Sequence, residues 1–299
     1  MSPIYEPYTA ALSASICEKY RRVQHAGVEK TVGHACMTKK YIIIKPNCRE
    51  LANHLWNYIS IYAYGLETGA PVYNPSFFEW HRYFNLSGGK LRIPKIFLSL
   101  YGSYLVRMRA SCVLLTISEV TYLPPTRPLV VRKSPCDTTY FIGWLFRNPL
   151  GLEKYRSEIV SAFAPKKHIL KKIEDALAPF RGKKLIGIHL RQQPYKGFED
   201  GSFLVPPARV RAIVDEYLRE KKLTIEDVEL ITVSDEYDVT NLFLLSRCSV
   251  VIGTNSTFSN LAAWFGNIPH IVTTNDPVNW EYYRDKATYF ENKYATFAQ

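Results

Sequence analysis

Hydrophobic positions along the chain form two patterns, short apolar runs and longer segments in which apolar residues recur every three or four positions. The short runs predict buried strands, and the longer spacing predicts helices with one apolar face. In the second half of the chain, strands are predicted at 185–189, 228–233, 250–252 and 270–272. Helices are predicted at 152–163, 166–180, 210–218, 238–246 and 257–265. Strands that alternate with helices in this way are typical of a doubly wound α/β fold with a parallel sheet.

The first half of the chain shows the same pattern less completely. A strand is predicted at 41–45, and Asn47 with Glu50 three residues later is typical of a capping box that opens a helix. That helix ends at Gly69, and the next strand is expected at 71–74, which completes a β-α-β unit. Weaker signals predict a helix at 10–23 and strands at 112–117 and 129–131.

The two halves predict two Rossmann-like domains that face a cleft, the first over residues 1–150 and the second over residues 151–299. A chain of 299 residues is long enough for both, since domains usually hold ~100–200 residues. Ligands of open parallel sheets bind outside the carboxyl ends of the strands. We therefore expect the binding residues in the loops that follow the strands of the second domain.

Three of those loops carry suitable side chains. Arg191 follows the first strand of the second domain, and its guanidinium can contact phosphate oxygens in pairs. Asp235 follows the next strand and can accept hydrogen bonds from a purine or a ribose, whereas Ser256 and Thr257 open a helix whose amides favour phosphate. Each has a structural alternative: a surface ion pair for Arg191, and helix caps for Asp235 and for Ser256 with Thr257.

Charge narrows the choice of partners only in part. The chain has 38 basic and 27 acidic residues, a net charge of +11, which favours nucleic acid, an anionic membrane or a phosphorylated small molecule. The lysines lie in scattered pairs without a basic stripe or a nucleic-acid motif, so no nucleic-acid partner is expected.

Other features of the sequence indicate in which cellular compartment the protein is expected. No apolar run approaches the ~18 residues of a membrane span, and the N-terminus lacks the pattern of a secretory signal. The six cysteines are far apart and form no C-x-x-C pair, which is typical of reduced thiols and argues against a zinc site. We therefore expect a cytoplasmic chain, with the removal of a membrane anchor left open.

Several segments match one set of motifs in order. His189, Arg191 and Tyr195 match H-x-R-R-x-D-Y, and residues 233–236 match an S-D-D segment. Residues 244–264, from Leu-Leu-Ser-Arg-Cys through Asn-Ser-Thr-Phe-Ser to Ala-Ala-Trp, match L-M-S-x-C … N-S-T-F-S-W-W-A-A-W. Two further segments match less well. Residues 51–69 are similar to G-R-L-G-N-Q-L-F-Q-Y … A-x-x-x-G, and residues 141–155 are similar to G-Y-W-Q … Y-F. Over roughly residues 40–275 the chain thus resembles the α-1,2-fucosyltransferase family and its α-1,6- and protein O-fucosyltransferase relatives.

The resemblance implies a glycosyltransferase-B-like fold and an inverting transfer that needs no metal. The donor would be a nucleoside-diphosphate sugar, GDP-fucose in this family, and the acceptor a hydroxyl of an oligosaccharide or of a glycoprotein glycan. By the same resemblance Arg191 would bind the leaving diphosphate, His189 would shape the same loop, and Asn53 would face the donor across the cleft. Further contacts with the nucleotide sugar are implied for Ser234, Asp235, Asn255, Ser256, Thr257 and Phe258. The sequence holds no D-x-D metal motif, and we expect no cofactor besides the nucleotide sugar.

The chain departs from the motifs at several positions. Gln192 replaces the second arginine, Pro194 replaces an acidic residue, and Glu50 replaces an arginine at the first helix of the β-α-β unit. The positions around Glu50 differ as well, with Arg49 and Ala52 for two glycines and His54 for a glutamine. Two alternatives follow: a UDP-sugar donor such as UDP-xylose, or a sugar- or nucleotide-binding module without catalytic activity.

The general base of an inverting transfer should be a carboxylate close to the acceptor hydroxyl. Glu50 is the first candidate, because it adds an acid near the transfer centre. The other candidates are Glu79, Asp137, Glu199 and Asp200.

Overall fold

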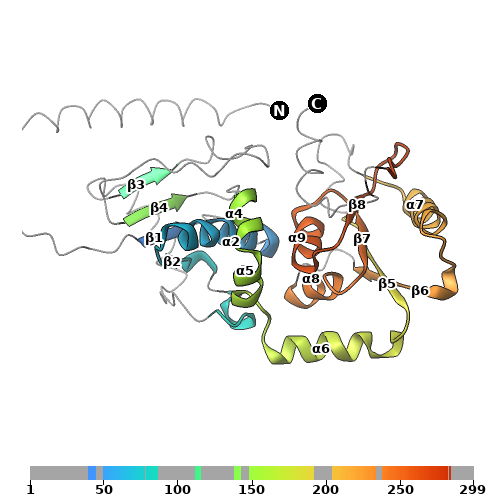
Figure 1. The fold of residues 1–299 in the computed structure, drawn as a ribbon, viewed down its shortest axis with the longest axis horizontal. Coiled ribbons are helices and arrows are strands. Elements are labelled where there is room, and N and C mark those ends of the chain that lie inside the picture. Colours follow the sequence, from blue (N-terminus) through green and yellow to red (C-terminus); the bar gives the residue numbers. More distant parts are fainter. Residues whose placement is uncertain are drawn as a thin grey trace, which may run out of the picture. The chain divides into compact units, whose positions relative to one another are not determined.

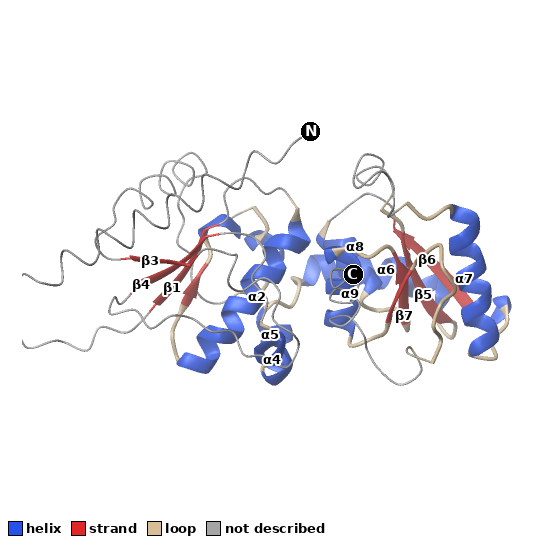
Figure 2. Cartoon of the chain, turned by 90° about the horizontal axis from the view of Figure 1, so that it is seen from above, coloured by secondary structure: helices blue, strands red, loops and turns tan. Residues whose placement is uncertain are grey.

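The structure is built on two four-stranded sheets in which all strand pairings are parallel (Figures 1 and 2). This computed structural model describes residues 40–44, 50–77, 79–86, 112–115, 138–142, 148–191, 204–233, 238–281 and 283. All of them belong to the compact unit of residues 38–299; the second unit, residues 1–37, lies outside the described residues, as do the helix predicted at 10–23 and the strand predicted at 129–131. The predicted α/β class with parallel sheets is confirmed, whereas the domain boundary at residue 150 and the cleft stay predictions.

The first sheet has the strand order β2-β1-β4-β3. Its strands are β1 (Lys40–Ile44), β2 (Val72–Tyr73), β3 (Cys112–Leu115) and β4 (Thr138–Ile142). The sequence pattern predicted the first three but not β4, which pairs with β1 from Lys40↔Thr138 to Ile44↔Ile142 and therefore lies inside the sheet. The signal in β4 is its run of β-branched and aromatic residues rather than an apolar run.

Helix α2 (Leu51–Thr68) connects β1 to β2 and confirms the predicted β-α-β unit. It ends at Gly69, whose φ of 67° lies in the left-handed region that glycine tolerates best. The capping-box prediction for its start is wrong: Glu50 is itself the N-cap residue rather than the third helical residue, and its side chain makes no cap hydrogen bond. Asn47 lies outside the described residues.

Helices between the two sheets differ from the prediction at one place. The structure has α4 (Pro149–Lys154), α5 (Arg156–Ala162), α6 (Lys167–Leu177) and a 3₁₀ turn at Ala178–Phe180. The single helix expected at 152–163 is thus two short helices that meet at Tyr155, whose φ of −108° and ψ of 26° are not helical. The first helix begins early because Asn148 accepts the backbone N–H of Gly151 at 3.1 Å and Pro149 suits the first turn.

The second sheet has the strand order β6-β5-β7-β8 and matches the prediction closely. Its strands are β5 (Lys184–His189), β6 (Val228–Val233), β7 (Val250–Gly253) and β8 (His270–Val272). The helices that follow its strands are α7 (Pro207–Glu220), α8 (Val239–Leu245) and α9 (Thr257–Gly266), and a 3₁₀ turn at Ile225–Asp227 precedes β6. Two other 3₁₀ turns, Pro75–Phe77 and His81–Tyr83, follow β2 of the first sheet.

Alternate residues of β5 and β7 pack on opposite faces of this sheet. Ile186, Ile188, Val250 and Ile252 belong to a cluster with the apolar face of α7, whereas Val251 belongs to a cluster with α8 and α9. Both faces are therefore buried, which explains why these strands read as continuous apolar runs.

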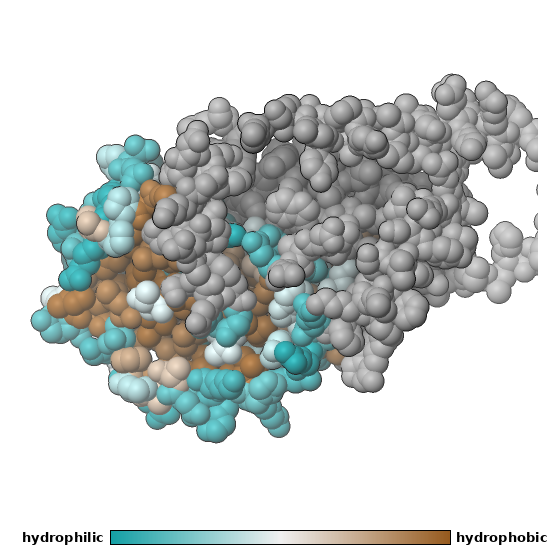
Figure 3. Space-filling view, turned by 180° about the vertical axis from the view of Figure 1, so that it is seen from behind, coloured by the Kyte–Doolittle hydropathy of each residue, from teal (hydrophilic) through white to brown (hydrophobic). Residues whose placement is uncertain are grey.

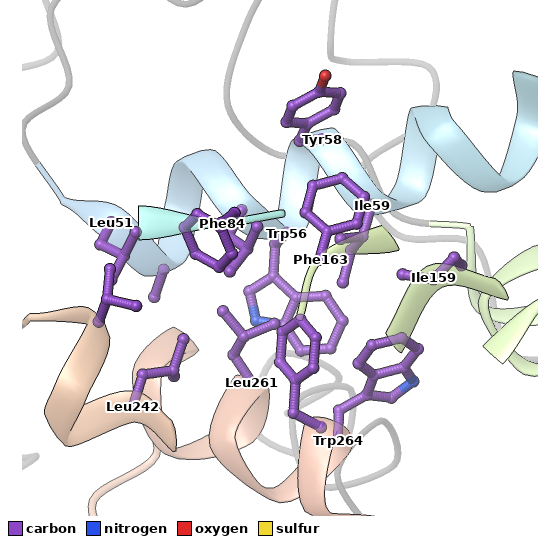
Figure 4. Packing of buried hydrophobic residues seen from close by; sticks show 14 of the residues in the cluster. Leu51, Trp56, Tyr58, Ile59, Phe84, Ile159, Phe163, Leu242, Leu261 and Trp264 are labelled. Carbon is purple, nitrogen blue, oxygen red and sulfur yellow. The ribbon is translucent and has the colours of Figure 1, made fainter. Parts of the chain in front are cut away.

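The larger of the two hydrophobic clusters extends from the first sheet to α8 and α9, and α2 is its centre. Figure 4 shows side chains of α2, such as Leu51 and Trp56, directed toward Leu242, Leu261 and Trp264. This packing supports the start of α2 beside α9, the region in which several predicted site residues lie.

Few large apolar side chains in the described part of the chain are strongly exposed. Among the described residues only Leu150 and Ile225 are exposed large hydrophobics, so the hydrophobic area in Figure 3 belongs mainly to buried and half-buried residues. In the part of the chain that the structure describes, no helix combines the length and the hydropathy that a membrane crossing requires.

Buried His270, at the start of β8, makes folding stability dependent on pH. Its Nδ1 lies 3.1 Å from Asn260 Oδ1, and burial lowers its pKa from 6.5 to about 4, against a smaller opposite effect of a backbone hydrogen bond with Gly253. Above pH 6.5 the ring is neutral in both the folded and the unfolded chain, and the folded state has its full stability. Below pH 6.5 the unfolded chain binds a proton that the folded chain excludes, so the free energy of unfolding declines as the pH falls toward 4. We expect His270 to lower the free energy of unfolding by about 2 kcal/mol between pH 8 and pH 5.

Urea unfolding of the wild type and of His270→Asn at both pH values measures this contribution. The variant should lose stability by about 2 kcal/mol less than the wild type over this interval. An identical loss in both proteins would show that His270 does not titrate in this range.

Candidate functional site

The predicted site residues of the second sheet follow β5, β6 and β7, three adjacent strands whose carboxyl ends lie at one edge. The structure describes His189, Arg191 and residues 255–258. Ser234 and Asp235 lie outside the described residues, and so do Gln192, Pro194 and Tyr195. The structure therefore tests the placement of the β5 and β7 loops but not of the β6 loop.

His189, the last residue of β5, connects the ends of two strands to the start of α9. Its ring is fully buried, its Nδ1 lies 2.6 Å from Ser259 Oγ and 3.5 Å from Ser256 Oγ, and its ring centroid lies 5.1 Å from that of Phe258. Such contacts hold the β5 end against α9, whereas the role that the family resemblance implied for His189 stays a prediction.

Gly253, at the end of β7, is required by the close approach of β5. A Cβ at this position would lie 2.6 Å from the carbonyl oxygen of His189 and 3.2 Å from Ser259 Oγ. The same carbonyl accepts the N–H of Thr254 at 3.1 Å. Glycine thus allows the chain to leave β7 in contact with His189 and to enter α9.

The start of α9 confirms the capping alternative for Ser256. Ser256 is the N-cap residue, and its Oγ accepts the backbone N–H of Ser259 at 3.1 Å. Ser256 and Phe258 are buried, whereas Asn255 and Thr257 are half-buried. The carbonyl of Thr257 accepts the indole N–H of Trp56 at 2.9 Å, so α2 directly supports this helix start. A role of these four residues in binding nucleotide stays a prediction.

Arg191 meets Glu50 and Asn53 at the start of α2. Arg191 Nη2 donates to Glu50 Oε1 at 2.8 Å, and Asn53 Nδ2 donates to Glu50 Oε2 at 2.5 Å. Arg191 thus forms an ion pair, as in the alternative interpretation, but its own side chain is only 15% exposed while that of Glu50 is 43% exposed. Glu50 thereby links two other predicted site residues, Asn53 three positions along the chain and Arg191 141 positions along the chain.

Among the described residues, three buried polar atoms near these strand ends and the α2 start are recorded without a hydrogen-bond partner. They are Thr254 Oγ1 after β7, Thr273 Oγ1 after β8 and Asn53 Oδ1 in α2. The two threonines are neighbours, because the N–H of Thr273 donates to the carbonyl of Gly253 at 2.8 Å. Buried polar atoms without partners are rare in folded proteins, and a ligand or an ordered water would satisfy them. Sequence analysis missed Thr254 and Thr273, although each directly follows a strand.

The described residues contain no group of three or more His, Cys, Asp or Glu side chains able to hold a metal ion. Metal independence itself stays a prediction. Cys248 is a buried free thiol beside Gly187 of β5, and burial raises its pKa to about 12, so it is a packing residue rather than a nucleophile.

Comparison of this geometry with known proteins gives matches among solved structures only. No protein-family model and no curated protein matches the sequence. A mutant of FUT1 from Arabidopsis thaliana in complex with GDP matches with a TM-score of 0.50 and 12% identity, covering 90% of this chain and 74% of that chain. Fucosyltransferase NodZ from Bradyrhizobium matches with a TM-score of 0.51 and 14% identity, covering 81% of this chain and 97% of that chain.

The chain has the fold of these fucosyltransferases. The resemblance predicted from the motifs is therefore confirmed at the level of the fold. The matches cover 90% and 81% of this chain, so neither is limited to one half of it. In this chain the ion pair of Glu50 with Arg191 connects the start of α2 to the end of β5.

Proposed function

We propose that this protein is an inverting, metal-independent glycosyltransferase. It moves a sugar from a nucleoside-diphosphate sugar, GDP-fucose by likeness to its structural neighbours, to a hydroxyl of an oligosaccharide or a glycoprotein glycan. The observation that supports this most directly is the position of Arg191, a largely buried guanidinium at the carboxyl end of β5 in a fold shared with a GDP complex of FUT1.

The proposed chemistry needs stabilisation of the charge that develops on the leaving diphosphate. Arg191 supplies a fixed positive charge and the N-terminus of α9 supplies backbone dipoles, and such preorganised groups are effective because they need no rearrangement during the reaction. The proposal uses no cofactor. His189, Ser256 and Phe258 hold the two loops in place, and the unpartnered hydroxyls of Thr254 and Thr273 are additional donors for the nucleotide sugar.

Incubation of the purified chain with a panel of nucleotide sugars, with and without glycan acceptors, tests the proposal by measuring the release of nucleoside diphosphate. We expect release from GDP-fucose that rises when an acceptor is present. Release from UDP-xylose alone would favour the UDP-sugar alternative. Binding of a nucleotide without any turnover would favour a non-catalytic binding module, and absence of both would contradict the proposal.

Thermal unfolding with GDP, UDP and guanosine gives a second readout that needs no acceptor. A ligand present at 100 times its Kd stabilises the folded state by about 2.7 kcal/mol. We expect this gain from GDP and little from guanosine, which lacks the diphosphate that Arg191 would bind. Equal stabilisation by GDP and guanosine would exclude Arg191 as the diphosphate ligand.

A further inference from the structure

Glu50 forms an ion pair with Arg191 at the candidate site, and three features hold its carboxylate there. Its two oxygens accept hydrogen bonds from Arg191 and from Asn53, at 2.8 Å and 2.5 Å. Glu50 is also the N-cap residue of an 18-residue helix, where the helix dipole favours negative charge. Its side chain makes no cap hydrogen bond, so both oxygens are directed to side chains rather than to the helix amides.

A carboxylate and a phosphate group place similar demands on arginine. Both are anionic oxygen acceptors that bind the planar N–H groups of a guanidinium. Glu50 Oε1 therefore occupies, at Nη2 of Arg191, a donor that a phosphate oxygen would use. The 43% exposure of Glu50 leaves the carboxylate room to move away without burying an unpaired charge, and Asn53 together with the helix N-terminus still favours its charge after Arg191 is taken.

We propose that Glu50 is an internal competitor for Arg191 that weakens binding of the free nucleoside diphosphate and thereby promotes product release. This inference rests on the proposed function for the identity of the ligand. The terminal phosphate of a free diphosphate loses a second proton near pH 6 and gains a negative charge that the sugar-linked donor lacks. Repulsion by Glu50, and its competition for Arg191, therefore act more strongly on the product than on the donor.

Glu50→Gln is the variant that tests this competition, because it removes the charge and keeps an amide oxygen for Asn53. By titration calorimetry at pH 7.5, we expect this variant to bind GDP about 10-fold more tightly than the wild type. In the glycosyltransferase assay the inhibition constant of GDP should fall more than the KM of the donor. Glu229→Gln is the matched control: Glu229 pairs with Lys183 at 3.5 Å at the opposite end of the sheet, and its loss should leave GDP affinity unchanged.

Two further variants separate competition from other effects of the substitution. In an Arg191→Ala background, Glu50→Gln should give a clearly smaller gain in GDP affinity, because only the repulsion by Glu50 is left once the group for which it competes is absent. Glu50→Asp withdraws the carboxylate from Arg191 and should give an intermediate gain. Unfolding temperatures of all variants establish that each is folded, and a Glu50→Gln protein that binds GDP no more tightly than the wild type would overturn the proposal.

The same experiment distinguishes this inference from the proposed function and from a role of Glu50 as general base. Inorganic pyrophosphate is the second probe: tighter binding of pyrophosphate by Glu50→Gln, without GDP binding by any variant, would support competition and contradict the nucleotide-sugar function. Normal GDP binding with no gain in Glu50→Gln would overturn competition alone. A large loss of turnover in Glu50→Gln at unchanged GDP affinity would overturn the competition and favour Glu50 as the general base. Failure of every variant to bind either probe would overturn both proposals.

Discussion

Replacement of Arg191 by alanine is expected to lower kcat/KM for the nucleotide sugar by roughly 100- to 1,000-fold. Arg191 is the charged residue at the end of β5, and its guanidinium would stabilise the charge that develops on the leaving diphosphate. The loss of one preorganised donor at a developing anion typically costs about 3–4 kcal/mol of transition-state stabilisation. Steady-state assays of diphosphate release measure the loss, which should affect kcat as well as KM because the charge grows during the transfer.

Controls for Arg191→Ala come from the same chain. Arg191→Lys keeps the charge but not the planar fork, and should retain part of the activity. Arg211→Ala removes an arginine that is 69% exposed and pairs with Asp215 one helical turn away at 3.6 Å, and it should leave the activity unchanged. Full activity of Arg191→Ala would remove the residue from the mechanism and leave the proposed function without its main support.

Replacement of Trp264 by alanine is expected to lower the free energy of unfolding by about 3–5 kcal/mol. Trp264 in α9 is completely buried, with its ring centroid 6.1 Å from that of Trp56 in α2 and 5.1 Å from that of Phe265. The Arg156 guanidinium lies 5.5 Å from the same ring and donates to the Trp264 carbonyl at 2.7 Å. Alanine would leave a cavity between α2 and α9 that these rigid neighbours cannot fill.

Urea unfolding at constant pH measures this loss, and two variants serve as controls. Trp264→Phe retains most of the ring and removes an indole N–H that is buried without a partner, so it should cost less than half as much as alanine. Leu150→Ala shortens a side chain that is 38% exposed and should change stability by no more than about 0.5 kcal/mol. If Trp264→Ala and Leu150→Ala were equally stable, the packing between α2 and α9 would not contribute as described.

The sequence predicted most of the second sheet because its strands are buried on both faces and its helices have clear apolar faces. Each of its four strands agrees with the structure to within one residue, from β5 to β8. The failures have local causes. The β4 strand lacks a continuous apolar run, and its place beside β1 depends on pairing between residues about 100 positions apart. The break at Tyr155 interrupts a helical pattern that continues through it, so periodicity could not locate it.

The residues of the candidate site were predicted only in part, because local patterns do not show which distant residues meet. The strand-end rule located Arg191, Ser256 and Thr257, and the motifs added His189 and Asn53. No sequence rule indicated that Glu50 contacts Arg191, since they are 141 residues apart and the capping-box pattern assigned Glu50 a local role. Thr254 and Thr273 were missed because threonine after a strand has no specific signal; only their burial without partners distinguishes them.

By itself, the sequence determined the α/β class, the order of most elements and the resemblance to fucosyltransferases, because hydrophobic periodicity and short motifs are local properties of the chain. The tertiary structure decided the position of β4, the packing of α2 against α9 and the contacts of Glu50 with Arg191 and Asn53. These features depend on which distant segments meet, and that is set by the burial of complementary surfaces rather than by any local pattern. The +11 net charge illustrates the difference: it suggested anionic partners, yet at the one arginine described at this site a carboxylate from the same chain already balances the charge.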